Sequence, residues 1–305
     1  MIDIHYPLVH IFPKGFDMRR RAFVVFVSIL SVVLASCVTQ TDPTDIRGVW
    51  KAEAEGEEYM FSFTSDGFYA FEHSWDGYRD YVDFGSYQVE FDETGEGTII
   101  TDSYDYYCFR DGKYLVIDYY GTEISFTRTS RTAKNNTSAS NLKGVWSDGI
   151  SVTGFSSRGV VLTMGATLGM QDYSADETDV FIDGSECPYL IINNKLYICD
   201  DNGFLGAWTS TVLERKTSGG NEQTSRDILV NYSPWHLTDT GDGTSHYIYT
   251  FTSTGRYNME YYYEGYSDRS TSSGSYTYSG NSIELSDDAD LAYAIIDNVP
   301  FMFTF

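Results

Sequence analysis

Few side chains of this sequence combine the types and the spacing that catalysis needs. Common hydrolases place a nucleophile beside a base, most often a histidine. After residue 37 the chain has His73, His236 and His246, and none stands in a recognisable catalytic motif. His236 and His246 flank one loop and could form a metal pair with Asp239 and Asp242, but we interpret them as solvated loop histidines. We therefore expect no metal, no cofactor and no enzyme, although a carboxylate pair among the 44 acidic residues stays open as an alternative.

Cys37 is the residue with the clearest chemistry. Arg19–Arg21 precede a 14-residue apolar run, Ala22 to Ala35, that suits a signal peptide and falls short of the roughly 20 residues that cross a bilayer. The sequence Leu34-Ala35-Ser36-Cys37 then resembles the lipobox of bacterial lipoproteins. The resemblance implies cleavage between Ser36 and Cys37 and acylation of Cys37. We expect a signal peptide over 1–36, with Met18 as a candidate true start, and a lipidated tether over 37–46.

Charge excludes one class of partner. The whole chain has a net charge of −24, and cleavage would remove four basic and two acidic groups, so the mature chain is near −26. Such a surface repels nucleic acid and anionic headgroups. We therefore expect no nucleic-acid partner and a membrane contact through the lipid on Cys37 alone. The expected location is the cell envelope, in the outer membrane if the cell has one.

Two of the remaining cysteines are a candidate disulfide. An oxidising compartment permits a bridge, and Cys187 and Cys199 lie on the two arms of a hairpin turning near Asn193-Asn194. They face each other only if the loop has an odd number of residues. A two-residue loop would place Cys199 opposite Pro188 and turn Cys187 to the other face.

Short alternating segments and internal repeats indicate an all-β chain. Residues 63–69 (FTSDGFY) match 251–257 (FTSTGRY), and 155–161 (FSSRGVV) is a weaker copy. Gly85-Ser86-Tyr87 matches Gly274-Ser275-Tyr276 further along. One tryptophan precedes each copy, at Trp50, Trp146 and Trp235. We expect three tandem domains, over 47–129, 143–217 and 232–305, joined by flexible polar linkers over 130–142 and 218–231.

The first repeat shows the expected domain most clearly. Eight strands are predicted, over 47–53, 57–64, 67–74, 80–91, 97–101, 105–110, 113–118 and 122–128. Tyr59, Phe61 and Phe63 share one face of the second strand and alternate with polar residues. Eight hairpin-linked strands with one dry face would leave two open edges, and an up-and-down antiparallel barrel removes both.

A family resemblance follows from the tryptophans. Gly48-Val49-Trp50 and Gly144-Val145-Trp146 resemble the G-x-W motif of lipocalins and the wider calycin group. The resemblance implies that Trp50 and Trp146 plug the closed ends of their barrels, and that Arg128 and Arg215 on the last strands lie across them, within about 6 Å of the ring centre. It covers 47–129 well and 143–216 moderately.

The third repeat departs from this family pattern. Ser233-Pro234-Trp235 replaces G-x-W, and alignment places Phe301–Phe303 on a seventh strand with too few residues left for an eighth. We expect Trp235 to lack an arginine and its strand to lack a closing neighbour. Either this is the least stable domain, or the open edge captures a strand from a linker or another molecule.

Two aromatic hairpins are candidate ligand contacts. Their residues are Trp75, Tyr78 and Tyr81 in the first repeat, and Tyr261, Tyr262, Tyr263 and Tyr266 in the third. Flat rings beside charged groups suit a sugar or a protein partner, whereas rings that line or cover a barrel are a simpler explanation. Together these observations predict a non-catalytic, membrane-anchored binding or interaction module whose partner is an envelope protein or a glycan. The alternative is a lipocalin-type carrier of a small apolar ligand in one barrel.

Overall fold

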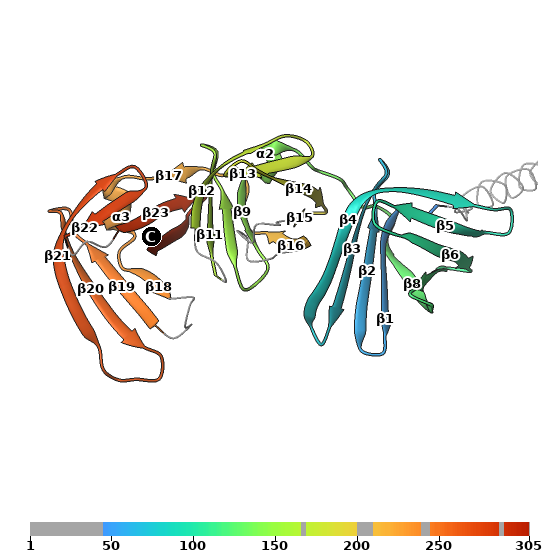
Figure 1. The fold of residues 1–305 in the computed structure, drawn as a ribbon, viewed down its shortest axis with the longest axis horizontal. Coiled ribbons are helices and arrows are strands. Elements are labelled where there is room, and N and C mark those ends of the chain that lie inside the picture. Colours follow the sequence, from blue (N-terminus) through green and yellow to red (C-terminus); the bar gives the residue numbers. More distant parts are fainter. Residues whose placement is uncertain (1–44, 166–168, 200–209, 239–244, 287–289, 305) are drawn as a thin grey trace, which may run out of the picture. The chain divides into compact units, whose positions relative to one another are not determined.

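The computed structural model describes residues 45–165, 169–199, 210–238, 245–286 and 290–304. Regular structure in these ranges is almost entirely antiparallel strand, with the short helices α2 (Ala139–Leu142) and α3 (Arg226–Asn231) between them (Figure 1). Within this part of the chain, neither helix has the length and apolar character needed to span a membrane. Cys37 and the expected signal peptide lie outside the described residues.

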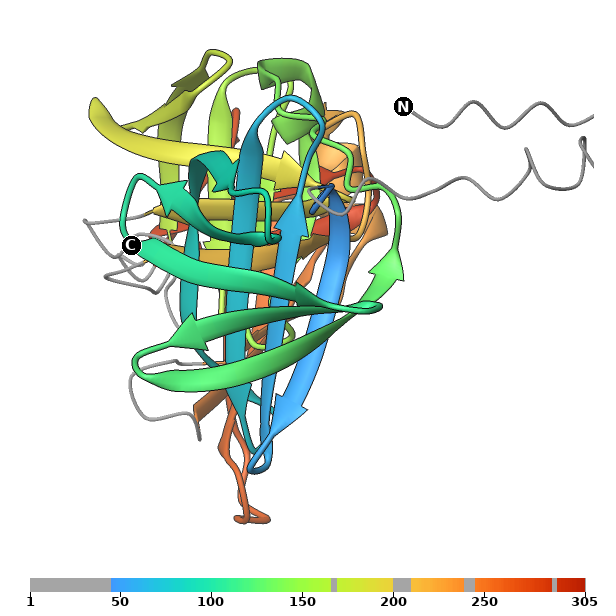
Figure 2. The same cartoon turned by 90° about the vertical axis from the view of Figure 1, so that its right-hand side faces the viewer.

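The first repeat is a closed barrel of eight antiparallel strands that follow one another in sequence order. They are β1 (Gly48–Ala54), β2 (Glu57–Phe63), β3 (Phe68–Trp75), β4 (Tyr78–Phe91), β5 (Glu96–Thr101), β6 (Asp105–Asp111), β7 (Tyr114–Tyr119) and β8 (Thr122–Ser130). Closure comes from β1 and β8, where Trp50 stands opposite Arg128. Figure 2 shows these strands, blue to green, nearest the viewer. The eight-stranded up-and-down barrel predicted from the sequence is confirmed for this repeat.

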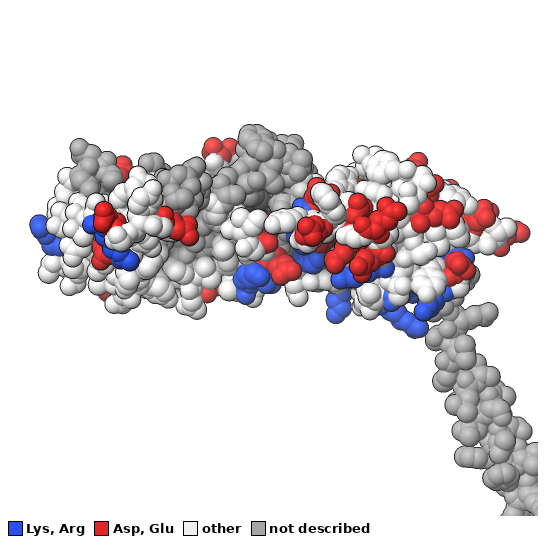
Figure 3. Space-filling model, turned by 90° about the horizontal axis from the view of Figure 1, so that it is seen from below, with Lys and Arg blue, Asp and Glu red and all other residues white. Residues whose placement is uncertain are grey.

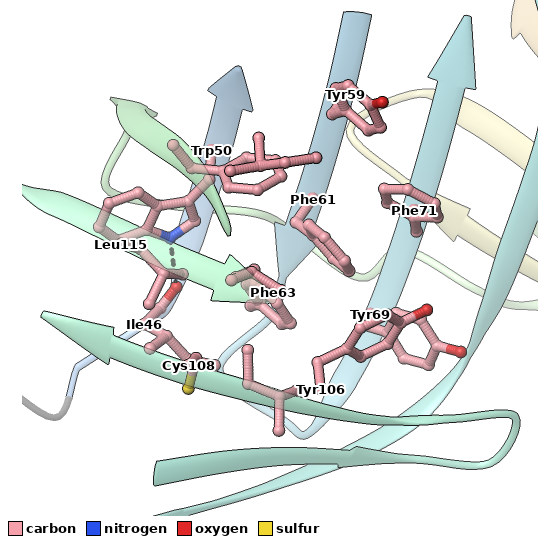
Figure 4. Packing of buried hydrophobic residues seen from close by; sticks show 14 residues of the cluster. Ile46, Trp50, Tyr59, Phe61, Phe63, Tyr69, Phe71, Tyr106, Cys108 and Leu115 are labelled. Carbon is pink, nitrogen blue, oxygen red and sulfur yellow. Dashed lines mark hydrogen bonds between the residues drawn. The ribbon is translucent and has the colours of Figure 1, made fainter. Parts of the chain in front are cut away.

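Aromatic side chains fill the lumen of this barrel. Phe61 is fully buried, and its ring centre lies 4.4 Å from that of Phe71, 5.3 Å from Phe63 and 5.5 Å from both Tyr106 and Phe126. Figure 4 shows Phe61, Phe63, Phe71 and Tyr106 pointing into the barrel. Burial of one such side chain contributes about 1.5–3 kcal/mol, so the filled lumen is the main stabilising element of the domain.

The second repeat is also a closed eight-stranded barrel, with shorter strands. They are β9 (Gly144–Ser147), β10 (Val152–Phe155), β11 (Val160–Met164), β12 (Gly169–Ala175), β13 (Asp179–Ile182), β14 (Ser185–Ile192), β15 (Lys195–Cys199) and β16 (Ser210–Arg215). β16 closes on β9, where Arg215 stands opposite Trp146. Its core is mainly aliphatic, with Leu196, Ile198 and Leu213 packed around Trp146. The predicted barrel is confirmed here as well.

The third repeat is an open sheet in the described residues. Its strands are β17 (Glu222–Gln223), β18 (Trp235–Thr238), β19 (Ser245–Phe251), β20 (Arg256–Tyr263), β21 (Ser270–Ser279), β22 (Ser282–Leu285), β23 (Asp290–Ile296) and β24 (Val299–Thr304). The order runs β17-β23-β22-β21-β20-β19-β18, and β24 also pairs with β23. β24 holds the position of a seventh strand, as predicted, and β18 is an end strand of the sheet. The structure therefore gives two closed barrels and one partial barrel.

The segments expected to be flexible linkers are ordered, which corrects the prediction from composition. In the first, Asn136 N donates to Ile191 O at 2.8 Å, and Lys134 O accepts from Asn193 N at 3.0 Å. In the second, β17 pairs with β23, so a strand from the expected linker joins the third sheet, although not at β18. Asn, Ser and Thr side chains supply the hydrogen bonds that order such polar segments.

A buried ion cluster joins the first and second barrels. The carboxylate of Glu72, on β3, accepts hydrogen bonds from Lys195 at 2.7 Å and from the Tyr197 hydroxyl at 2.6 Å. Arg79 completes the cluster, 3.1 Å from the second carboxylate oxygen. Burial and the charge of Glu72 raise the pKa of Tyr197 well above its ordinary value. Each charge in the cluster has a partner, which is the condition for tolerating a buried ion pair.

Candidate functional site

Each repeat holds its tryptophan with the same hydrogen bond. The indole Nε1 donates to a backbone carbonyl just upstream, from Trp50 to Ile46 at 2.6 Å and from Trp146 to Leu142 at 2.7 Å. Figure 4 shows the first of these bonds as a dashed line. Trp235 donates to the carbonyl oxygen of Leu229, a residue of α3, at 2.8 Å. All three tryptophans are buried, and Trp50 lies near the start of β1.

Arginine lies across the first two tryptophans. The guanidinium carbon of Arg128 is 4.5 Å from the centre of the Trp50 ring, and that of Arg215 is 4.1 Å from Trp146. Both distances lie within the about 6 Å expected for a cation–π contact. Arg110, which sequence reasoning did not select, lies 4.8 Å from the same Trp50 ring. Burial lowers the pKa of Arg215.

Trp235 has aromatic neighbours in this position. Tyr293, on β23, meets it edge to face at 5.9 Å between ring centres, and Tyr232 lies 6.2 Å away. Trp235 thus packs against aromatic rings, whereas Trp50 and Trp146 pack against arginine. Because all three tryptophans are buried, none presents its ring to a ligand in solvent.

The opposite end of the first barrel carries a ring of four tyrosines, which we call the tyrosine mouth: Tyr104, Tyr106, Tyr119 and Tyr120. They come from the β5–β6 turn, the start of β6, the end of β7 and the β7–β8 turn. Ring centres are 6.2 Å apart for Tyr104 and Tyr106, 6.5 Å for Tyr106 and Tyr119, 4.7 Å for Tyr119 and Tyr120, and 6.0 Å for Tyr120 and Tyr104. Each ring thus touches the next, and the circuit closes.

A cavity of about 280 Å³ lies at the tyrosine mouth. Tyr106 is buried and supports the cavity from the barrel side, while Tyr104 and Tyr120 are 44% and 73% exposed. Tyr107, Asp105, Asp118 and Gly121 also line it. One oxygen of Asp118 accepts a hydrogen bond from Gly121 N at 2.6 Å. The arrangement brings aromatic rings and two carboxyl groups together at a cavity that is open to solvent. It has the small number of polar groups among aromatic walls that binding pockets show.

A histidine is clamped beside the mouth. His73 stacks on Tyr59 at 4.6 Å, and its Nε2 and Nδ1 lie 3.0 Å from Glu57 and 2.9 Å from Asp80. Tyr59 also donates a hydrogen bond to Glu57, and these two contacts lower the pKa of the Glu57 carboxyl, the tyrosine having the larger effect. Both ring nitrogens of His73 lie against carboxylates, so the imidazole is held from both sides. The cluster therefore fixes the rim of the barrel rather than offering a free base.

The sequence-selected aromatics of the first repeat lie next to this site rather than in it. Trp75 and Tyr78 flank the β3–β4 turn and are 64% and 75% exposed. Tyr81 is partly buried and packs on Phe71 at 6.0 Å. Sequence reasoning missed the four tyrosines of the mouth because they lie in or beside two separate turns. The available signal was that alternate hairpins of an up-and-down barrel meet at one end.

The selected aromatics of the third repeat divide between two faces of β20. Tyr261 lies 4.8 Å from Tyr247 and 5.1 Å from Tyr263, so these rings form one row. Tyr263 continues to Tyr266 at 6.3 Å. Tyr262 lies on the other face. Its ring centre is 4.8 Å from that of His246, on which it stacks, and 4.7 Å from the guanidinium carbon of Arg269. The structure thus pairs Tyr262 with a cation of its own chain.

The candidate disulfide is corrected by the strand register. Asn193-Asn194 forms a two-residue turn with Ile192 opposite Lys195. Cys187 pairs with Val180 on β13 and Cys199 with Ser210 on β16, so the two do not face each other. All three described cysteines are thiols. Burial raises the pKa of Cys108 to about 12, which keeps that thiol protonated.

The acidic turns and histidines give no metal site in the described residues. There, no group of three or more His, Cys, Asp or Glu side chains is placed to hold an ion. Asp92 accepts hydrogen bonds from Thr94 N at 2.8 Å and Glu96 N at 3.1 Å, as an ordinary turn residue does, and the pKa of its carboxyl is lowered. His236 and His246 lie on strands rather than in a loop. Asp239 and Asp242 lie outside the described residues.

Comparisons with known proteins add no functional information. No protein-family model matches the sequence, and no curated protein matches it. One solved structure that aligns is the beta clamp of Helicobacter pylori bound to a DNA ligase peptide, with 8% identity over 88% of this chain and 93% of that chain, at a TM-score of 0.19. Another is the DNA polymerase III subunit beta of Pseudomonas aeruginosa, with 6% identity over 88% and 94% of the two chains, at 0.21. Such low TM-scores do not indicate a shared fold.

Proposed function

We propose that this protein is a non-catalytic binding module of a bacterial cell envelope, held to a membrane by lipid on Cys37. The tyrosine mouth of the first barrel is its binding surface in this proposal. The observation that supports it is the pair of exposed rings, Tyr104 and Tyr120, held over a cavity at the end of a packed barrel. Exposed aromatic side chains on a rigid support are typical of recognition surfaces.

The lumen of the first barrel argues for a surface site over a carrier function. A lipocalin-type carrier needs internal space for an apolar ligand, whereas Phe61, Phe71 and Phe126 meet at the centre of this barrel at ring distances of 4.4 and 5.5 Å. The second barrel has Leu196, Ile198 and Leu213 buried in the same role. The Trp–Arg plugs support a lipocalin-like ancestry, and binding at the rim is compatible with it.

The anchoring part of the proposal is tested on the processed N-terminus. Mass spectrometry of the protein from membranes should show a chain that begins at an acylated Cys37. A Cys37→Ser variant should leave the membrane fraction. An intact N-terminal segment, or a Cys37→Ser protein that still fractionates with membranes, would contradict the anchor. Protease treatment of intact cells then tells whether the module faces outward.

The binding part is tested with a rim variant and a matched control. The processed lipoprotein in non-ionic detergent is titrated with isolated envelope glycans and envelope proteins. The double variant Tyr104→Ala, Tyr120→Asn should lose most retention, while Tyr78→Ala, which removes an equally exposed ring outside the cavity, should keep it. Asn is chosen because Tyr120 has a positive φ of 52°, which Asn tolerates. Equal retention by both variants would exclude the tyrosine mouth as the binding surface.

A further inference from the structure

The chemistry of the tyrosine mouth narrows the class of ligand. The four tyrosines of the mouth line a cavity of about 280 Å³ together with Tyr107, and the other lining residues include Asp105 and Asp118. None of the described lining residues is Lys or Arg. The π-face of an aromatic ring carries partial negative charge, so rings and carboxylates here act with the same sign.

The buried carboxyl group of Asp83 lies near the tyrosine mouth and acts on Tyr106. Asp83 is 8% exposed and accepts hydrogen bonds from the Tyr69 hydroxyl and from Ser103 Oγ, the latter at 2.9 Å. Both partners are neutral, so they orient the carboxylate without cancelling a negative charge. In Figure 3, Asp and Glu side chains gather over the first barrel, at the right.

The pKa values of three tyrosines at or beside the mouth are raised. Burial raises the pKa of Tyr119 to about 12, with further contributions from Tyr120 and Asp80. Burial and the charge of Asp83 also raise the pKa values of Tyr81 and Tyr106. The side chains of Tyr81, Tyr106 and Tyr119 therefore stay neutral, and they lie near carboxyl groups.

The same chain already contains cation–ring contacts of this kind. Arg269 lies over Tyr262 at 4.7 Å in the third repeat, beside Glu260 at 2.8 Å. Lys113 lies over Tyr114 at 5.1 Å in the first barrel. In the third repeat, one tyrosine face and one carboxylate share a guanidinium. The tyrosine mouth offers more ring faces and carboxylates around a cavity, and no Lys or Arg of the described lining fills it.

We propose that the tyrosine mouth binds an organic cation, with an ammonium or quaternary ammonium group enclosed by Tyr104, Tyr106, Tyr119 and Tyr120 and faced by Asp105 and Asp118. This inference rests on the proposed function and specifies the ligand of the same site. An aromatic ring attracts a cation more strongly when the cation is desolvated. The large negative charge of the chain raises the local concentration of cations.

The test compares two probes of the same shape. Choline and 3,3-dimethyl-1-butanol differ only in the charged nitrogen, which a carbon atom replaces in the alcohol. Calorimetric titration of the processed lipoprotein in non-ionic detergent should show choline binding at least roughly tenfold more tightly than the alcohol. Equal binding of both probes, or no binding of choline, would overturn the cation site.

The variants assign the binding to the rings. Tyr120→Asn should weaken choline binding roughly three- to tenfold, which corresponds to one lost ring contact. Tyr78→Ala should leave it unchanged, and an equal loss in both variants would overturn the assignment. Binding of a soluble short-chain phosphatidylcholine as well as choline would identify a lipid headgroup as the source, whereas choline alone would identify a free cation. Binding of a neutral glycan in place of choline would overturn the cation site and leave the proposed binding function standing.

Discussion

The first and third repeats share a turn and a tryptophan but differ in the glycine that precedes the tryptophan. Gly48 has a φ of +115°, and a Cβ built there would lie 2.2 Å from the carbonyl oxygen of Ser130 at the end of β8. In the second barrel, a Cβ on Gly144 would lie 2.4 Å from Thr217 O. The last strand of a closed barrel therefore requires glycine at this position.

The third repeat has Ser233 at the equivalent place. In the described residues β18 pairs with β19 alone, and Ser233 carries a side chain just before it. The Ser233 hydroxyl donates to Leu229 O at 3.2 Å and accepts from Phe251 N at 2.9 Å. In these three repeats, the residue two positions before the tryptophan is glycine where the barrel is closed and serine where the sheet is open. The tryptophan itself, with its indole hydrogen bond to an upstream carbonyl, does not depend on closure.

The largest expected effect comes from Gly48→Ala. The substitution combines a positive φ with a collision against backbone, so we expect a loss of roughly 3 kcal/mol or more in the unfolding free energy of the first barrel. Gly56→Ala is the matched control, because Gly56 has a φ of +88° with no atom within 4 Å of its Cβ. It should cost only about 1–2 kcal/mol. Segment-resolved denaturant unfolding measures both, and equal losses would show that β8 does not impose the glycine.

The next effect concerns the edge of the open sheet. β1 is bonded to β2 and to β8, whereas β18 is bonded to β19 alone in the described residues. We expect backbone amides of β18 to exchange with solvent roughly 100-fold faster than those of β1. Hydrogen exchange followed by mass spectrometry measures this. Equal protection in a monomer, with no added strand against β18, would show that the eight-strand template does not apply to the third repeat.

A smaller effect tests what the two repeats share. A tyrosine hydroxyl closes the strand-linking turn in every repeat, from Tyr87 to Thr64 O at 2.9 Å, from Tyr173 to Ser156 O at 2.6 Å and from Tyr276 to Thr252 O at 2.8 Å. Removing the hydroxyl leaves the carbonyl without this partner. Tyr87→Phe and Tyr276→Phe should each cost about 1 kcal/mol in their own domain. A loss confined to one of them would show that the shared turn is not energetically equivalent.

Sequence reasoning recovered the elements that depend on local pattern. Alternation on β2, the repeated turns and the tryptophan spacing predict the strands and their number, because burial of one face imposes a period of two. The Trp50–Arg128 contact was expected only from the resemblance to the lipocalin motif, and in the structure the two residues stand opposite each other on the strands that close the barrel. The missing partner of β18 could be predicted by aligning the third repeat with the first.

What could not be predicted depends on contacts between distant segments. The tyrosine mouth joins two turns and the strand ends beside them, and neither turn has a motif of its own. The polar segment around Asn136 is ordered because it bonds to Ile191 of the second barrel, which composition cannot show. Whether Cys187 and Cys199 face each other depends on whether the loop between them has an odd or an even number of residues, and the structure has a two-residue loop.

The smallest effect concerns pH and again separates the first repeat from the third. Hydrogen bonds from Tyr59 and His73 lower the pKa of Glu57 below its ordinary value of 4.5. A lowered carboxyl pKa stabilises the folded state fully above the ordinary value, and this stabilisation is lost as the pH falls through the lowered folded value. The first barrel should therefore lose a small amount of stability as the pH falls below about 4.5, and Glu57→Gln should reduce that loss. Glu260→Gln, in the exposed pair with Arg269, is the matched control and should change stability by at most about 1 kcal/mol. Unfolding followed segment by segment between neutral and acidic pH decides the matter, and an unchanged acid profile in Glu57→Gln would show that the histidine clamp does not stabilise the rim.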